Sequence, residues 1–321
     1  MRTSVVAPAR LHVALIDMGG VTQARYGGAG FAIKEPGTVV EAKSSQRNDV
    51  KGLARDDPRL PALLSALRRL SELTRSTATV TVTQAPAAHL GLGSTTSLAL
   101  ASITAASAAC GLTLADAQIQ VVSGRGGASG VGVNTFFCGG FVVDGGHPFD
   151  KDGEQRPSDF RQGFGVPRVR VALEVPGDWA FYLVQPAGRL WNLEAEEGFF
   201  AENTPIPREE VLEVIALVYH GLVPAVEAAD LKSVSQVIRE LQETGFKKRE
   251  IGGQLGGVGA AIEALRRRNI GAVGMSSMGP LVYVVAEESA AAEKQIKAAC
   301  DEAGARYLLK TNGAAGHRLL A

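Results

Sequence analysis

Short stretches of alternating apolar and polar residues predict strands in the first part of the chain. Such alternation is typical of a strand that buries one face. The largely apolar stretches 11–16 and 31–33 also predict strands, and the alternation itself occurs at residues 78–84. The first two stretches flank a bend rich in glycine (Gly19, Gly20, Gly27, Gly28 and Gly30), which indicates a hairpin-like pair.

Helical spacing follows in the same half of the chain. Leucines recur at steps of three and four residues and predict a helix over residues 51–75: Leu60, Leu63, Leu64, Leu67 and Leu70. A second helix is predicted over 95–110, closed by Gly111, and a third from Thr113, which forms a capping-box pattern with Asp116, to about residue 122. A strand is predicted over 135–143, inside the glycine-dense segment 123–146.

The second half of the chain mixes both patterns. Strands are predicted at 169–175, 179–185, 281–286 and 306–310, and helices at 208–219, 231–243, 257–268 and 288–303. The polar segment 147–167 contains prolines and glycines and predicts a long loop. We therefore predict two domains, residues 1–165 and 166–321, of the α+β class, because no regular strand–helix–strand repeat is present.

The order strand, glycine loop, helix at residues 78–110 predicts an anion site. Backbone N–H groups and the positive end of a helix dipole converge at such a loop. Its residues are Gly91, Leu92, Gly93, Ser94, Thr95 and Thr96. The three hydroxyls are suited to phosphate oxygens or to Mg²⁺. Simple helix capping and tight packing are the alternatives for this loop.

Composition narrows the class of protein. Glycine makes up 38 of the 321 residues, well above the roughly 7% of an average protein. Lys and Arg balance Asp and Glu at a formal net charge of zero, which argues against a nucleic-acid binder. Three scattered cysteines and the lack of a long apolar run indicate a cytoplasmic protein without a membrane span.

Two motifs resemble the GHMP small-molecule kinase superfamily. No G-x-x-x-x-G-K-[ST] or G-x-G-x-x-G pattern occurs, so the P-loop and Rossmann classes are disfavoured. The run 86–97 resembles the superfamily's P-x-G-x-G-L-G-S-S-A motif, and the run 271–280 resembles its C-terminal glycine–serine motif. The resemblance implies an N-terminal domain like ribosomal protein S5 domain 2 and a C-terminal ferredoxin-like domain.

Departures from the kinase pattern indicate one branch of that superfamily. His89 replaces a glycine, and Gly132 stands where such kinases carry an acidic residue that orients or deprotonates the attacking hydroxyl. Together with the runs 10–12, 15–17, 124–126 and 139–147, these departures resemble the β-ribofuranosylaminobenzene 5′-phosphate synthases of methanopterin biosynthesis. That resemblance implies phosphoribosyl transfer from 5-phosphoribosyl 1-diphosphate to 4-aminobenzoate or 4-hydroxybenzoate, with loss of CO2 and pyrophosphate. It also implies a homodimer.

Candidate catalytic residues follow from these motifs. They are Arg125, Asp17, His89 and Asp144. Arg125 suits a phosphate or carboxylate because its guanidinium binds such groups with two hydrogen bonds. Ser94 and Asp17 are the candidate ligands for Mg²⁺. The alternatives are a solvated loop arginine for Arg125, turn-forming roles for the two aspartates and a structural role for His89.

Other polar residues are weaker candidates. Arg10 and Arg25 could serve the same task as Arg125, and the role of His147 is left open. His12, His220 and His317 show no metal-ligand spacing and are assigned no role. Two other functions stay open at this point: an ATP-dependent kinase of a small alcohol, which the shared phosphate loop would suit, and a catalytically silent ligand-binding relative, which Gly132 would suit.

Overall fold

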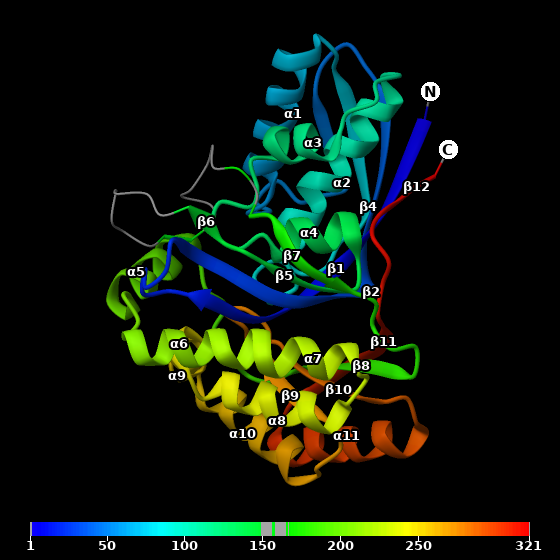
Figure 1. Ribbon diagram of the computed structural model, residues 1–321. Coiled ribbons are helices and arrows are strands. Elements are labelled where there is room, and N and C mark those ends of the chain that lie inside the picture. The colour runs from blue at the N-terminus through cyan, green and yellow to red at the C-terminus, as the bar shows by residue number, and fades with distance from the viewer. Residues whose placement is uncertain (1, 149–155, 158–164, 166, 321) are drawn as a thin grey trace.

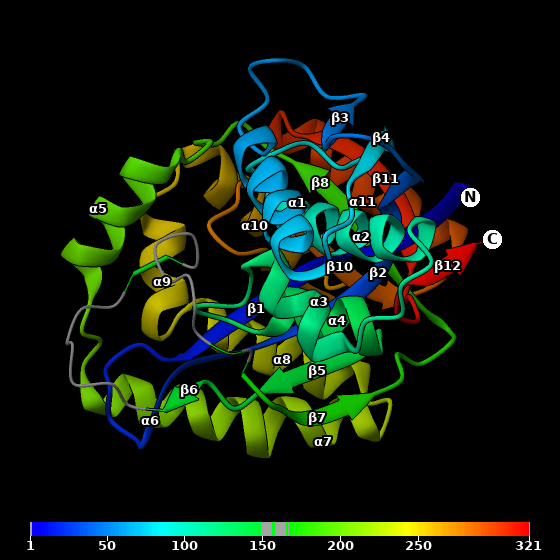
Figure 2. The same cartoon turned by 90° about the horizontal axis from the view of Figure 1, so that it is seen from above.

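The computed structural model describes residues 2–148, 156–157, 165 and 167–320, and it contains two sheets that pack through one continuous core. Figure 1 shows helices α1 to α4 on one side of the first sheet and a long helix on its other side, beside the second sheet. Figure 2 shows the same arrangement from above, with the two termini next to each other. No helix in the described part of the chain is long and apolar enough to cross a membrane.

The first sheet is built on two long strands that form an antiparallel pair. Strands β1 and β2 cover Arg2–Asp17 and Ala24–Ser44, so the predicted hairpin is confirmed but is much longer than the sequence pattern indicated. The sheet order is β12–β1–β2–β4–β3, and β5 and β6 also pair with β2, while β7 pairs with β5. The remaining strands are β3 Asp49–Lys51, β4 Ala78–Gln84, β5 Phe141–Asp144, β6 His147–Pro148, β7 Val169–Leu173 and β12 Arg318–Leu320.

Four helices cover one face of this sheet. They are α1 Leu60–Thr74, α2 Ser94–Ala109, α3 Asp116–Ser123 and α4 Val131–Cys138. Helix α2 packs against β1 and β2 and is rich in alanine and serine, so its backbone can approach the sheet closely. Gly111 has a φ of +74° directly after this helix, as predicted for its closing residue.

Three sequence predictions in this half are wrong. The helix predicted over 51–75 begins only at Leu60, because Lys51 ends β3, residues 52–59 form bends and turns, and Pro61 occupies the first turn of the helix. The helix predicted from Thr113 begins at Asp116, and the side chain of Gln118 accepts the Ala115 N–H instead. The strand predicted over 135–143 is divided into α4 and β5 by Gly139 and Gly140, whose φ angles are +70° and +63°.

The second sheet has the antiparallel order β11–β8–β10–β9. Its strands are β8 Trp179–Gln185, β9 Ala272–Met275, β10 Val282–Glu287 and β11 Arg306–Asn312. The accompanying helices are α5 Leu193–Asn203, α6 Arg208–Ala216, α7 Val223–Glu227, α8 Leu231–Gln242, α9 Gly245–Gly252, α10 Gly256–Arg267 and α11 Ala290–Ala303, and a π-helical stretch, Leu217–Leu222, joins α6 to α7. The predicted helices and strands of this half are confirmed, whereas α5, α7, α9, β9 and β12 were not predicted.

The two sheets are joined by direct core packing. Phe31 of β2 lies 5.4 Å from Phe181 of β8 between ring centroids, and both rings are fully buried. Residues beyond position 165 also enter the first sheet, because β7 pairs with β5 and β12 pairs with β1. Most of the predicted loop 147–167 lies outside the described residues, so the domain boundary at residue 165 stays a prediction.

Close packing between β1 and β2 generates a stability prediction. A Cβ on Gly30 would lie 2.3 Å from the Leu11 carbonyl oxygen and 2.7 Å from a Val131 methyl carbon. We expect Gly30→Ala to lower the free energy of unfolding by about 1–3 kcal/mol, because such overpacking forces backbone shifts. Urea denaturation checks this value.

Gly198 is the matched control for this substitution. It lies inside α5 with open space around its Cβ position, so Gly198→Ala should stabilise the protein by about 0.5–1 kcal/mol. Equal effects of the two substitutions would contradict the packing argument.

Candidate active site

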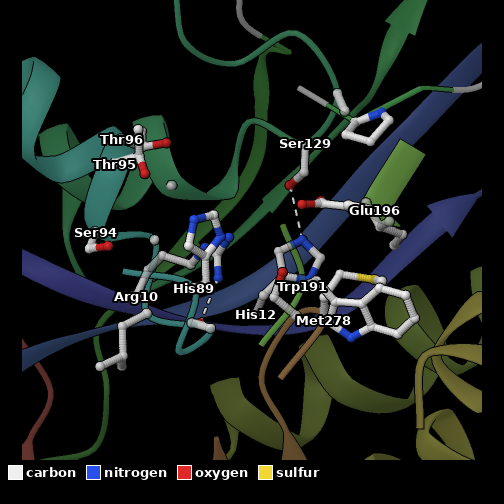
Figure 3. A pocket seen from close by; sticks show the side chains of 18 of the residues that line it. Arg10, His12, His89, Ser94, Thr95, Thr96, Ser129, Trp191, Glu196 and Met278 are labelled. Atoms are coloured by element: carbon white, nitrogen blue, oxygen red, sulfur yellow. Dashed lines mark hydrogen bonds between the residues drawn. The ribbon is translucent and has the colours of Figure 1, made fainter. Parts of the chain in front are cut away.

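A cavity of about 170 Å³ lies where the glycine loop, β1 and the C-terminal glycine–serine segment meet. Figure 3 shows the loop hydroxyls of Ser94, Thr95 and Thr96 at one end and the Trp191 and Met278 side chains at the other. His12 stands between these ends in that view. The cavity thus has a polar end and an apolar end.

The polar end is formed by the N-terminus of α2. Gly93 precedes the helix with a φ of +67°, and its carbonyl oxygen accepts the N–H groups of Thr96 and Ser97 at 3.1 Å. No side chain among the described residues caps this helix. The first amides and the positive end of the dipole are therefore directed at the cavity, which favours an anion there.

The glycine loop is held in place by Ser276 of the C-terminal segment. The fully buried Ser276 hydroxyl donates to the Gly91 carbonyl oxygen at 2.7 Å and accepts the His12 N–H at 2.9 Å. Gly91 has a φ of +99°, and a Cβ there would lie 2.4 Å from the Ser276 carbonyl oxygen. Only glycine fits this contact, which fixes the loop against the residues that follow Ser276 along the cavity wall.

Two guanidinium groups border the glycine loop. Arg10 of β1 donates through Nη1 to the Gly91 carbonyl oxygen at 2.9 Å, and Arg125 donates through Nε to Thr96 Oγ1 at 3.2 Å. Burial lowers the pKa of Arg10 to about 10, so the group still carries its charge at neutral pH. Its Nε atom is buried and has no hydrogen-bond partner among the described residues.

Gly132 lies beside these cations and leaves space in the cavity. It lines the cavity from α4, and a Cβ there would lie 3.4 Å from Thr96 Cγ2 and 3.8 Å from Arg10 Nε. These are ordinary contact distances, so the position could hold a larger side chain. Because it holds none, the space next to Arg10 stays open for a ligand.

A buried ion pair also borders the cavity. Lys247 and Glu250 of α9 form an ion pair with both side chains only 2% exposed, and Lys247 Nζ donates to the Ser277 carbonyl oxygen at 3.0 Å. Burial lowers the pKa of Lys247. Glu250 and Glu196 both line the cavity, so positive charge from the arginines is partly balanced by carboxylates.

The apolar end is lined by large hydrophobic side chains. They are Leu15, Trp191, Phe200 and Met278. Trp191 packs against Phe199 at 5.0 Å between ring centroids, and the Arg189 guanidinium lies 4.8 Å from the Trp191 ring centroid. The indole Nε1 is buried without a hydrogen-bond partner among the described residues. This end therefore suits a flat apolar group that carries one polar substituent.

A chain of three side chains connects the cavity to the protein interior. His12 Nε2 lies 3.1 Å from Ser129 Oγ, and Ser129 Oγ lies 3.5 Å from Asp144 Oδ2. Asp144 also accepts the N–H groups of Gly130 and Gly146, both at 3.0 Å. Burial raises the pKa of Asp144 to about 7, while burial together with the charges of Arg10 and Lys247 lowers the pKa of His12.

The structure brings most of the predicted site residues together. His89, Arg125 and the loop from Gly91 to Thr96 all line the cavity. Arg10, a weaker candidate in the sequence, lines it as well. Arg25 is buried in β2, and His147 Nε2 lies 2.9 Å from the Gly126 carbonyl oxygen; neither residue lines the cavity.

Asp17 and Asp144 are not among the residues that line the cavity. Asp17 accepts the backbone N–H groups of Gly19, Val21 and Thr22, at 2.8 to 3.1 Å, and the hydroxyl of Thr22 at 2.9 Å. Both of its oxygens are used in its own turn, so the structure favours the turn-forming role over the ligand role predicted for Asp17. Asp144 reaches the cavity only through Ser129.

Sequence reasoning missed several residues of this cavity, above all His12, Ser129, Trp191, Glu196 and Glu250. For His12 a signal was present, because Arg10 and His12 are two residues apart within the otherwise apolar stretch 5–16 and must share a face of the strand. Glu250 gave no usable signal, since α9 was not predicted. Trp191 lies two residues before the unpredicted α5, and Glu196 lies in the first turn of that helix.

A magnesium site made by protein carboxylates is not supported. The described residues contain no group of three or more His, Cys, Asp or Glu side chains that could hold a metal ion. Ser94 lies at the polar end of the cavity, but Asp17 does not line it. The residues present fit a magnesium ion that a phosphate ligand brings with it, for which one or two protein oxygens are enough.

Known proteins include relatives whose sequences match this chain over most of its length. No protein-family profile matches the chain. It is 34% identical over 283 residues to a β-ribofuranosylphenol 5′-phosphate synthase of Archaeoglobus fulgidus, which covers 88% of this chain and 87% of that protein. A protein of the same name from Methanocaldococcus jannaschii is 31% identical over 303 residues, covering 90% of this chain and 91% of the relative.

Comparison with solved structures gives the fold. A homoserine kinase from Cytophaga hutchinsonii superposes with a TM-score of 0.70 at 16% identity, covering 99% of this chain and 97% of that one. A phosphomevalonate kinase of Streptococcus pneumoniae gives 0.70 at 11% identity, covering 98% of this chain and 100% of that one. The expected α+β fold of the GHMP kinase type is confirmed.

The buried Asp144 generates a prediction on the pH dependence of stability. An aspartate has an ordinary pKa of 3.8, and burial raises that of Asp144 to about 7, so the folded protein favours the neutral carboxyl. The contribution of the Asp144 carboxyl to the free energy of unfolding is complete below about pH 4 and is lost as the pH rises through 7. The free energy of unfolding of the wild type, relative to Asp144→Asn, should fall by roughly 4 kcal/mol between these limits.

Urea denaturation of both proteins at several pH values checks this slope. Asp178→Asn is the matched control, because the Asp178 side chain is exposed. A difference between the wild type and Asp144→Asn that does not change with pH would contradict the burial argument.

Proposed function

Because the chain belongs to the family of β-ribofuranosylphenol 5′-phosphate synthases, we propose that it transfers a phosphoribosyl group to a 4-substituted benzoate. The donor is 5-phosphoribosyl 1-diphosphate, and the ring carbon that carries the carboxylate bonds to the ribose. CO2 and pyrophosphate leave. The relatives' name includes a ribofuranosylphenol, which favours 4-hydroxybenzoate over 4-aminobenzoate as the acceptor. The resemblance described above suggests a role in methanopterin biosynthesis.

One observation carries this proposal, the absence of a side chain at Gly132. The phosphate loop is of the kinase type, but the position that holds the acid in such kinases is a glycine that faces Thr96 and Arg10. A reaction whose nucleophile is a ring carbon needs no base for an attacking hydroxyl. A site with anion-binding groups and without that acid therefore supports transfer to carbon over phosphorylation of an alcohol.

The polar end of the cavity suits the leaving pyrophosphate. The free amides of α2, the loop hydroxyls and the guanidinium groups of Arg10 and Arg125 already lie in place before the ligand arrives. Fixed donors of this kind stabilise charge that develops in the transition state without reorganisation. We infer that they stabilise the pyrophosphate as its bond to the ribose breaks.

The apolar end suits the benzoate ring. Trp191, Met278 and Phe200 line this end and would exclude water from a flat ligand. Removal of the carboxylate from water favours its loss as CO2, because the charged group loses its hydration while the neutral product does not need any. Ring and diphosphate thus occupy opposite ends of one cavity in this proposal.

Magnesium is part of the proposal as a companion of the diphosphate. Ser94 would be the protein group in contact with the ion, and the remaining ligands would be diphosphate oxygens and water. When bound, the ion would supply positive charge to the leaving group. A cytoplasmic location and a homodimer are likewise expectations that this proposal includes.

One prediction of the proposed function concerns the ratio of the two released products. Purified protein with Mg²⁺, 5-phosphoribosyl 1-diphosphate and 4-hydroxybenzoate should release CO2 and pyrophosphate in equal amounts, since both come from one transfer event. Release of labelled CO2 and an enzymatic pyrophosphate assay measure the two products. Formation of ADP from ATP and a small alcohol would support the kinase instead, and ligand binding without turnover of either benzoate would support the silent relative.

Another prediction of the proposed function concerns Arg125. Loss of one charge-assisted hydrogen bond costs about 1.5–3 kcal/mol, so Arg125→Ala should lower kcat/KM for the diphosphate donor by roughly 10- to 100-fold. Steady-state kinetics with varied donor measures this. The control is Arg47→Ala, which removes an exposed arginine outside the cavity and should leave kcat/KM unchanged. Equal kinetics of Arg125→Ala and wild type would remove Arg125 from the proposed site.

A further inference from the structure

His12 has a buried ring nitrogen that forms no hydrogen bond within the described part of the chain. The side chain is 3% exposed and lines the cavity, and Nδ1 has no hydrogen-bond partner among the described residues. A buried polar atom without a partner costs free energy, so such atoms in a cavity are commonly completed by a ligand. His12 lines the cavity and stands between its polar and apolar ends in the view of Figure 3.

The partners of Ser129 indicate which nitrogen of His12 carries the proton. Ser129 Oγ accepts the Val131 N–H at 3.2 Å and has Asp144 Oδ2 at 3.5 Å as an acceptor for its own proton. One lone pair then remains, and His12 Nε2 at 3.1 Å fills it as a donor. This assignment uses the hydroxyl proton and both lone pairs of Ser129, and it leaves His12 Nδ1 as an acceptor.

We propose that His12 Nδ1 takes the proton of the 4-hydroxyl group of a phenolic acceptor, while Ser129 and Asp144 hold the imidazole in the tautomer this requires. This inference rests on the function proposed above and assigns a residue to one part of it. His12 is then a catalytic residue, because it touches the substrate. Ser129 and Asp144 are positioning residues that act through it.

The chemistry of the step is balanced. The acceptor's O–H bond breaks, its proton moves to His12 Nδ1, and the electron pair left on oxygen enters the ring. The ring carbon that bears the carboxylate forms its bond to the ribose C1, and the pair of the C1–O bond leaves with pyrophosphate. The bond to the carboxylate then breaks, its pair restores the aromatic ring, and the oxygen takes its proton back from His12 as CO2 leaves.

The charges around His12 agree with this role once the donor is bound. Arg10 and Lys247 lower the pKa of His12 in the ligand-free protein, and Glu250 and Glu196 also border the cavity. A bound diphosphate adds negative charge to the same cavity. It therefore offsets the two cations and makes His12 a stronger base when both substrates are present.

The use of 4-aminobenzoate as the acceptor distinguishes a catalytic base at His12 from a histidine with a purely structural role. The nitrogen of 4-aminobenzoate donates its electron pair to the ring more strongly than a neutral hydroxyl oxygen does, so the ring can attack without prior loss of a proton. A base at His12 therefore assists the phenol and not the amine. Loss of a purely structural histidine would impair both acceptors equally.

The test compares both acceptors in His12→Gln, whose amide can keep the contact with Ser129 but cannot act as a base. We expect kcat with 4-hydroxybenzoate to fall by roughly 100-fold or more, the usual size of general base catalysis, and kcat with 4-aminobenzoate to fall less than about 10-fold. Ser129→Ala should show a smaller loss with the same selectivity. His220→Gln, an exposed histidine outside the cavity, should leave both rates unchanged.

Several outcomes would overturn the inference. These are an equal loss with both acceptors, no loss with the phenol, or wild-type protein that uses only the amine. His12→Ala and circular dichroism of each variant show whether a loss reflects misfolding.

A second measurement does not depend on turnover. Binding of 4-nitrophenol in the presence of pyrophosphate and Mg²⁺ should lower the apparent pKa of the bound phenol in the wild type, and His12→Gln should abolish this shift. If the wild type turns over neither benzoate but the shift is present, the proposed reaction fails while His12 retains its proton-accepting role. If the shift is absent from the wild type, the inference about His12 is wrong.

Discussion

The contact between Gly91 and Ser276 is the constraint on which the site depends. The Ser276 hydroxyl joins the carbonyl group of the glycine loop to the backbone of β1 at His12, and its own carbonyl oxygen lies where any Cβ at position 91 would have to be. This one residue therefore fixes three segments that are far apart in the sequence. The anion-binding end of α2, the strand that carries Arg10 and His12, and the cavity wall at Met278 keep their relative positions because of it. The site consequently exists only where the N-terminal and C-terminal parts of the chain are packed together.

Local signals in the sequence were sufficient for much of the fold. The loop at 91–96, helix α2 and strand β4 could be predicted because short-range patterns determine them: alternation in the strand, glycines in the loop and a left-handed residue after the helix. The structure of residues 135–143 could not be predicted in this way. Val, Thr and Phe favour a strand, whereas packing of α4 against β1 and β2 decides the conformation. The lengths of β1 and β2 likewise depend on pairing with distant strands, which no local pattern contains.

The candidate site was predictable in its polar half only. Glycine-rich loops and an arginine between glycines are visible in one sequence, and those residues do line the cavity. The aromatic half comes from α5 and the C-terminal segment, so its residues meet the loop only through tertiary packing. Asp17 and Asp144 show a case in which the sequence pattern is ambiguous. An aspartate next to glycines looks the same in sequence whether it binds a ligand or accepts backbone N–H groups, and the hydrogen bonds made by both residues are of the second kind.

The pairing of β12 with β1 has a consequence for the order in which the molecule is made. Ser4 pairs with Leu320 and Val6 with Arg318, so β1 leaves the ribosome long before the strand that pairs with it there. Until then this part of β1 has an open edge, and Ser276 is likewise made long after the glycine loop that it holds. Contacts of such sequence separation form slowly, since a long loop must close before they are made. Anion-binding activity should therefore appear late in synthesis, and an interrupted chain would have secondary structure and a partial core but no assembled cavity.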